Sequence, residues 1–161
     1  MRWFFAFFLT AIVADGAVSF HNEVLPVLTR QGCNAGTCHG SPSGKGGFAL
    51  SLFAFDAAAD YIALTKDFLS RRIEVLDPHL SLLLRKPSND LSHRGGLKLP
   101  RDSREYEILH GWIADGCLMD SPTTPKCVGI EIQSNAPSVL HWPQPNARLR
   151  VTARFADGTK R

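Results

Sequence analysis

The sequence predicts a mainly α-helical domain that is followed by the beginning of a β segment. Between residues 20 and 116, apolar residues recur at helical spacing, and several stretches carry start and stop signals for helices. From residue 127 onward, apolar and polar residues alternate with a period of two, and Asp157–Gly158 is a typical hairpin turn. Two or three strands are too few for a stable sheet of their own, so we expect the chain to be part of a longer multidomain protein.

The first helix is expected over residues 20–30, and Pro26 should confine its regular part to the residues that follow it. Four apolar side chains share one face of this helix: Phe20, Val24, Val27 and Leu28. Residues 48–56 are apolar and partly alternating, which favours an extended segment. A second helix should begin near Asp56.

A third helix is expected over residues 77–86, because Asp77 can cap it, Pro78 suits its first position and Pro87 stops it. The last helix, residues 103–115, carries the clearest signals of all. Asp102 is expected to cap it, Glu105 to complete a capping box, and Gly116 to end it. Its apolar stripe consists of Tyr106, Leu109, Trp112 and Ile113.

The first nineteen residues are typical of a secretory signal peptide. Arg2 precedes an apolar run from Trp3 to Val13, and Ala17 and Ser19 have the spacing that a signal peptidase reads. A run of eleven residues is too short to span a bilayer core of about 30 Å as a helix. We therefore expect an exported protein, periplasmic or at the cell surface, with no transmembrane helix in the mature chain; an uncleaved membrane anchor is the alternative.

Composition excludes several classes of function. The net charge of +3 is small, and no basic stripe interleaves with aromatic residues, so no nucleic-acid partner is expected. The glycine-rich stretch at residues 40–47 lacks the spacing and the Ser or Thr of a phosphate loop. No Gly-x-Ser-x-Gly elbow of a serine hydrolase occurs.

The stretch "QGCNAGTCHG", residues 31–40, has four residues between Cys33 and Cys38, with His39 directly after the second cysteine. A Cys33–Cys38 disulfide is geometrically possible and suits an exported protein, but it leaves His39 unexplained. A redox-active thiol pair prefers two intervening residues in a thioredoxin-like setting, and both conditions fail here. Covalent attachment of haem explains all three residues, because each thiol adds to one vinyl group and the histidine ligates the iron.

The two other cysteines do not complete the ligand set of a structural zinc site. A structural zinc site needs four nitrogen or sulfur ligands, usually as two close pairs. Cys117 and Cys127 are ten residues apart, which is too far for such a pair. A disulfide between them would tie the end of the last helix to the first strand, and pairing with a cysteine outside this chain is the alternative.

Residues 20–120 resemble the planctomycete-type cytochrome c domain of large exported planctomycete proteins. The matching stretches, in order, are "FHNEVLPVLTRQGCNAGTCHG", "GKGGFALSLFAFD", "DYIALTKD", "RRIEVLDPHLSLLLRKP", "HRGG" and "YEILHGWIADG". The resemblance implies a cytochrome c-like fold with haem c and its iron. Residues 125–161 are similar to the opening strands of an immunoglobulin-like module. The domains are therefore expected as a signal peptide at 1–19, a cytochrome c-like domain at 20–120, and a linker with opening strands at 121–161.

The resemblance also directs attention to the second axial ligand of the iron. The usual haem-attachment motif has two residues between its cysteines, whereas this chain has four. Relatives with the usual spacing offer a methionine just before the last helix. The corresponding loop of this chain reads "LSHRGGLKLP" and offers His93. Met1 belongs to the signal peptide, and Met119, beyond the last helix, is the second candidate. Gly95 and Gly96 would permit close approach of the backbone to the porphyrin. Four other histidines are not assigned as ligands, and His79 among them is expected at the surface: His21, His79, His110 and His141.

The expected function is one-electron transfer through haem held by Cys33 and Cys38, with His39 and His93 on the iron. With both axial positions filled, the domain would be a carrier and not an enzyme, and its redox partner protein is not identified by the sequence. A haem enzyme results if His93 does not bind the iron. The alternative from a different class is a haem-free extracellular binding or scaffold module with a Cys33–Cys38 disulfide.

Overall fold

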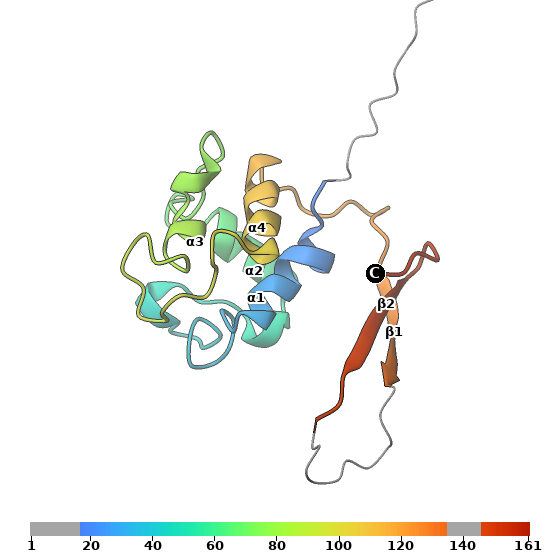
Figure 1. Cartoon of the computed structure of the whole chain (residues 1–161). Coiled ribbons are helices and arrows are strands. Elements are labelled where there is room, and N and C mark those ends of the chain that lie inside the picture. Colours follow the sequence, from blue (N-terminus) through green and yellow to red (C-terminus); the bar gives the residue numbers. More distant parts are fainter. Residues whose placement is uncertain (1–16, 135–145) are drawn as a thin grey trace, which may run out of the picture. The chain divides into compact units, whose positions relative to one another are not determined.

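The computed structural model describes residues 17–134 and 146–161, and within these ranges it contains four α-helices and a two-stranded antiparallel sheet (Figure 1). Most of the expected signal peptide, and His141, lie outside the described residues. In the two described ranges, no helix combines the length and the apolar character needed to cross a membrane. The order of helices followed by strands is the one predicted.

The described residues form two compact units. One unit comprises residues 17–18 and Leu64–Leu118. The other comprises Ser19–Ala63 and Met119–Arg161, and it contains the cysteine–histidine motif.

The first helix runs through residues 20–30 as predicted, but in two forms. A π-helical turn, Phe20–Val24, leads directly into α1, Leu25–Arg30. The Leu25 N–H donates to the Phe20 carbonyl, five residues back. Pro26 has no N–H to donate, so it sits in the first turn of α1, where the missing donor costs least. The predicted apolar face is confirmed, because its side chains are all buried together with Leu25: Phe20, Val24, Val27 and Leu28.

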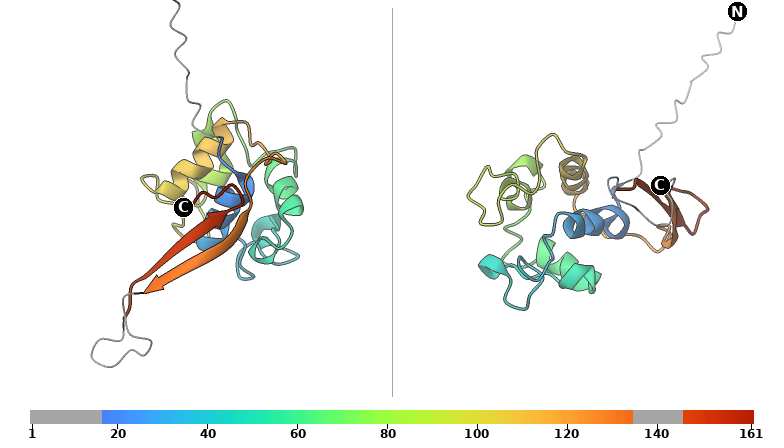
Figure 2. Two further views of the ribbon diagram at one scale, coloured as in Figure 1. Left: turned by 90° about the vertical axis from the view of Figure 1, so that its right-hand side faces the viewer. Right: turned by 60° about the horizontal axis from the view of Figure 1, so that its bottom comes forward.

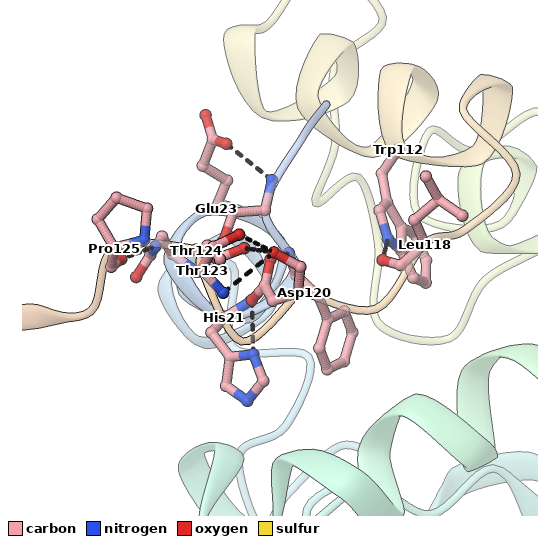
Figure 3. Close-up of polar contacts among 12 residues, drawn as sticks. His21, Glu23, Trp112, Leu118, Asp120, Thr123, Thr124 and Pro125 are labelled. Atoms are coloured by element: carbon pink, nitrogen blue, oxygen red, sulfur yellow. Dashed lines mark hydrogen bonds and ion pairs between the residues drawn. The ribbon is translucent and has the colours of Figure 1, made fainter. Parts of the chain in front are cut away.

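The start of this helix is held by the segment that leads to the sheet. The Asp120 carboxylate accepts hydrogen bonds from the N–H groups of Phe20, at 3.0 Å, and His21, at 2.8 Å. The Nδ1 atom of His21 lies 2.6 Å from the same carboxylate, and Figure 3 shows the two side chains turned toward one another. The Asn22 amide also donates to the Pro125 carbonyl. A carboxylate at this end of a helix meets unpaired N–H groups and the positive end of the helix dipole.

The second helix, α2, spans Ala57–Thr65 and begins where predicted. The Asp56 carboxylate accepts the Ala59 N–H at 3.0 Å, as a capping residue does. The preceding segment is only partly extended, since residues Leu52–Ala54 form a 3₁₀ turn. The buried Asp60 of α2 holds this segment by accepting from the N–H and the hydroxyl of Ser51.

The predicted third helix is broken in the structure. A 3₁₀ turn, Pro78–Leu80, and a short helix, α3, Leu82–Arg85, replace one continuous helix. Asp77 makes no capping bond, contrary to the prediction. The break lies at the buried Ser81, whose ψ is 131° and whose hydroxyl accepts the Glu74 N–H at 2.8 Å. This bond to another part of the unit outweighs the local preference for helix.

The last helix, α4, spans Arg104–Ala114 and is capped by Ser103, whose hydroxyl accepts the Tyr106 N–H. The predicted cap, Asp102, is therefore wrong by one residue. The predicted apolar stripe is confirmed, since its four side chains are buried: Tyr106, Leu109, Trp112 and Ile113. The Trp112 indole N–H donates to the Leu118 carbonyl at 2.9 Å (Figure 3).

Strands β1, Cys127–Ser134, and β2, Leu149–Phe155, pair antiparallel, and Figure 2 shows them side by side. The Asp157–Gly158 turn is confirmed: beyond it the chain doubles back, and Ala153 and Arg161 exchange two backbone hydrogen bonds. The alternation seen in the sequence places apolar side chains on one face, with Ile132 opposite Val151. These side chains are more than half exposed.

Candidate functional site

The cysteine loop begins at a defined helix end. Beyond α1, Gly32 has a φ of 72°, and its N–H donates to the Thr29 carbonyl. The N–H of Cys33 donates to the Leu28 carbonyl at 2.8 Å. These two bonds are the pattern of a Schellman motif, which needs a left-handed residue at the position of Gly32. The first cysteine is thereby fixed relative to the buried face of α1.

The loop then closes on itself and brings the second cysteine back to the first. The Ala35 carbonyl accepts the N–H groups of both Cys38 and Gly40, each at 2.9 Å. The N–H of His39 donates to the Cys33 carbonyl, also at 2.9 Å. The two cysteines therefore stand at the two ends of a closed loop, and both side chains are partly exposed. The four intervening residues are accommodated as a compact turn.

Gly40 and Asn34 make this closure possible. A Cβ atom on Gly40 would lie 1.9 Å from the Asn34 carbonyl oxygen, so only glycine fits at that position. Asn34 is fully buried, and its amide donates to the Thr29 hydroxyl at 2.9 Å. Its backbone carbonyl accepts the Phe53 N–H at 3.2 Å. Asn34 thus fastens the loop both to α1 and to the 3₁₀ turn Leu52–Ala54.

His39 is oriented by a backbone carbonyl. Its Nδ1 atom lies 2.9 Å from the Phe48 carbonyl oxygen, and its ring centre lies 4.6 Å from that of the Phe48 ring. Because a carbonyl oxygen can only accept, Nδ1 carries the hydrogen, and in the neutral ring the lone pair is on Nε2. The Leu50 N–H donates to the His39 carbonyl at 2.6 Å. Residues 48–50 therefore hold both the backbone and the ring of His39.

Exposed apolar side chains lie on the segment that is bonded to the cysteine loop. Three side chains of the segment that Asn34 fastens are at least half exposed: Leu52, Phe53 and Phe55. Phe53 and Ala54 have positive φ values of 52° and 61°, a conformation that bulky residues rarely adopt. Exposed apolar side chains in such a backbone conformation make this segment a candidate contact surface.

His93 lies in the other compact unit and is also oriented by a carbonyl. Its Nδ1 atom is 2.9 Å from the Gly96 carbonyl oxygen, so that its lone pair too is on Nε2. A Cβ atom on Gly95 would lie 2.7 Å from Cε1 of the His93 ring. Gly95 therefore permits close approach of the backbone to the His93 ring, a contact that the sequence alone did not predict.

The structure brings Cys33, Cys38 and His39 together and places His93 in a separate unit. Met119 belongs to the same unit as the cysteines and is 38% exposed. Sequence reasoning missed Asn34 and Phe48, which position the loop and the imidazole. In the sequence, Asn34 stands out only as a small residue of the motif. The Phe48 carbonyl is a backbone group, so no residue type indicates its role.

Cys117 and Cys127 are thiols in the structure and belong to different units. Cys117 is buried and follows Gly116, which ends α4 in the same way that Gly32 ends α1. Cys127 is exposed and its thiol donates to the Gly129 carbonyl. Within residues 17–134 and 146–161, no three His, Cys, Asp or Glu side chains gather as a metal cage.

No protein-family model, curated protein or solved structure matches this chain.

Proposed function

We propose that this chain is an exported c-type cytochrome domain that carries single electrons. Cys33 and Cys38 would hold haem c through thioether links, His39 would bind the iron on one side, and His93 would bind it on the other. When bound, the haem supplies a one-electron iron couple. The protein supplies the attachment points, the orientation of the ligands and an apolar surface.

The observation that carries the proposal is the hydrogen bond from His39 Nδ1 to the Phe48 carbonyl. Histidines that ligate metals nearly always donate their other ring N–H to a carbonyl, a carboxylate or water, which fixes the tautomer and the ring orientation. His39 already has this arrangement, directly beside a loop with a thiol at each end. A disulfide-bonded loop would need no such arrangement of His39.

The residues present fit a porphyrin in two further respects. Both thiols are partly exposed and can be reached by a ligand. The exposed side chains of Leu52, Phe53 and Phe55 offer the apolar contacts that a porphyrin ring requires. His93 has the same tautomer as His39, which supports it as the second ligand.

The test is expression of the full chain in a host with an intact haem-attachment system. We expect a Soret band that survives acid–acetone extraction, and a haem mass on the peptide of residues 31–40. Cys33→Ala and Cys38→Ala should each leave at most one thioether, whereas Cys127→Ala, an exposed cysteine outside the loop, should match the wild type. A colourless protein with a Cys33–Cys38 disulfide would establish the scaffold alternative instead.

His93 is tested separately in the coloured protein. His93→Ala should convert a low-spin ferric spectrum to one with an open position that binds cyanide or, after reduction, carbon monoxide. His79→Ala is the matched control on another histidine of the same unit. An unchanged low-spin spectrum in His93→Ala would exclude His93 and direct attention to Met119.

A further inference from the structure

Three aromatic rings gather between the 3₁₀ turn Pro78–Leu80 and helix α4. His79 comes from the turn, and Tyr106 and His110 lie one helical turn apart on α4. The ring centres of His79 and His110 are 4.3 Å apart, with an angle of 40° between the ring planes. The Tyr106 hydroxyl lies 3.0 Å from Nδ1 of His79. None of these residues belongs to the proposed haem site.

We propose that His79 and His110 form a binding site for a borderline divalent transition-metal ion, of the class of Zn²⁺ or Cu²⁺. Imidazole nitrogens are ligands that this class of ions prefers. Metal–nitrogen bonds of about 2.0–2.1 Å place the centres of two ligating rings roughly 4.5–5 Å apart at ordinary ligand angles. The observed 4.3 Å lies within a small side-chain adjustment of that range.

A ligating imidazole must be neutral and must offer a lone pair to the ion. The Tyr106 hydroxyl can accept a hydrogen bond from Nδ1 of His79, which leaves the lone pair on Nε2. A partner of this kind, behind the ligating histidine, orients its ring toward the metal.

Two protein ligands leave positions on the ion for water or for another molecule. Within the described ranges, no third His, Cys, Asp or Glu side chain completes the set. The site is thus an open one that exchanges its ion, in contrast to a closed structural zinc site with four protein ligands. Its ligand set is independent of the haem proposal.

The test is a calorimetric titration of the full chain with Zn²⁺ at neutral pH, with its cysteines bound to haem or alkylated. We expect one equivalent to bind and the thermal midpoint to rise with Zn²⁺ concentration. His79→Gln and His110→Gln should each weaken binding at least about tenfold, and Tyr106→Phe should weaken it by roughly tenfold. His21→Gln, on a histidine of the other unit that contacts Asp120, is the matched control and should bind like the wild type.

Lowering the pH should weaken binding, because protons compete with the metal ion for imidazole nitrogens. Thermal midpoints without metal separate loss of ligands from loss of folding in each variant. Wild-type affinity in His79→Gln or His110→Gln, or no binding by the wild type up to about 1 mM Zn²⁺, would overturn the proposal.

Discussion

At the scale of single residues, the partner of Nδ1 distinguishes the histidines of this chain. His39 and His93 each donate from Nδ1 to a backbone carbonyl at 2.9 Å. Nδ1 of His21 instead faces the Asp120 carboxylate, and that of His79 faces a tyrosine hydroxyl. A carbonyl cannot change its protonation state, so it holds one tautomer across the whole pH range in which the ring is neutral. The two proposed iron ligands share this property.

Sequence reasoning named His39 and His93 as candidate ligands but could not give their geometry. The spacing of Cys33, Cys38 and His39 is local and could be interpreted directly. The Phe48 carbonyl lies nine residues beyond His39, and a carbonyl is present at every position, so no residue type indicated the bond. The same reason hid the contact of Gly95 with His93, although the two glycines themselves were noted.

Gly95→Ala tests the positioning of His93. The new Cβ atom would lie 2.7 Å from Cε1 of the ring, so the imidazole must rotate away. We expect the coloured protein to lose part of its low-spin ferric spectrum and to gain affinity for cyanide. Gly36→Ala is the control, since its Cβ atom would meet only Leu52 at an ordinary 3.9 Å. Identical spectra for wild type and Gly95→Ala would show that His93 is not a ligand or is not held by this contact.

Gly40→Ala tests the closure of the cysteine loop. The new Cβ atom would overlap backbone atoms of Asn34, and no side-chain rotation can relieve this overlap. We expect the yield of covalently bound haem per mole of purified protein to fall severalfold, while Gly36→Ala retains the wild-type yield. Absorbance after acid–acetone extraction measures the outcome. A wild-type yield in Gly40→Ala would mean that attachment does not need the closed loop.

At the scale of elements, the position of a helix end depends on which of several neighbouring residues makes the capping hydrogen bond. Asp102 and Ser103 are both good capping residues, and the sequence could not decide between them. The structure selects Ser103, whose hydroxyl also donates to the Pro100 carbonyl at 2.6 Å. Ser81 shows the stronger effect, because its bonds to Glu74 interrupt a segment that has good helix signals. The bonds of Ser81 to Glu74 are not part of any helix-capping pattern that a sequence shows.

The Ser103 cap makes a paired prediction. Ser103→Ala should reduce the free energy of unfolding by about 1 kcal/mol, since the Tyr106 N–H loses its acceptor. Asp102→Ala should cost less than about 0.5 kcal/mol, as expected for an exposed site without a capping bond. Urea denaturation of both variants measures the difference. Equal losses of unfolding free energy, or a larger loss for Asp102→Ala, would indicate that Asp102 is the capping residue.

The Asp120 contact with the first helix predicts a dependence of stability on pH. Burial alone would raise the pKa of Asp120, but hydrogen bonds from the His21 backbone, Ser19 and the His21 ring lower it overall. A carboxyl whose pKa is lower in the folded state contributes stability above its unfolded pKa of about 3.9, and this contribution is lost as the pH falls through the folded value.

Asp120→Asn should therefore be less stable than the wild type at pH 7, and the difference should shrink toward pH 2. The free energy of unfolding of both proteins between pH 7 and pH 2 measures this change. Parallel curves at all pH values would exclude the titration of Asp120 as the cause.

At the scale of the whole molecule, the sheet contributes little buried surface, whereas the segment before it makes specific contacts. The large apolar side chains of β1 and β2 are mostly exposed, and Phe155 is the buried one among them. Asp120 and Pro125, in contrast, bond directly to residues of the first helical turn. The order of helices before strands followed from periodicity. The contacts of residues 119–125 with the first helix could not be predicted from the sequence, because these hydrogen bonds join residues about a hundred positions apart.

Truncation separates these two contributions. A chain that ends at Lys126 should keep most of the stability and the haem attachment of the wild type, since the apolar side chains that it loses are mostly exposed, apart from Phe155. A chain that ends at Leu118 should lose about 2 kcal/mol or more, because the first helix loses the acceptors at its start. Thermal and urea unfolding of the two truncated proteins measure the difference. Equal stability of the two would show that Asp120 is dispensable.

The burial of Cys117 has a practical consequence for spectroscopy on this chain. Burial raises the pKa of its thiol to about 11, and the positive charge of Lys66 offsets only part of that rise. The thiolate that reacts with maleimides is therefore scarce at neutral pH, whereas Cys127 is exposed. With haem on the other two sulfurs, a fluorophore or spin label should couple at Cys127 alone, so the native sequence already provides a single reporter position on the first strand.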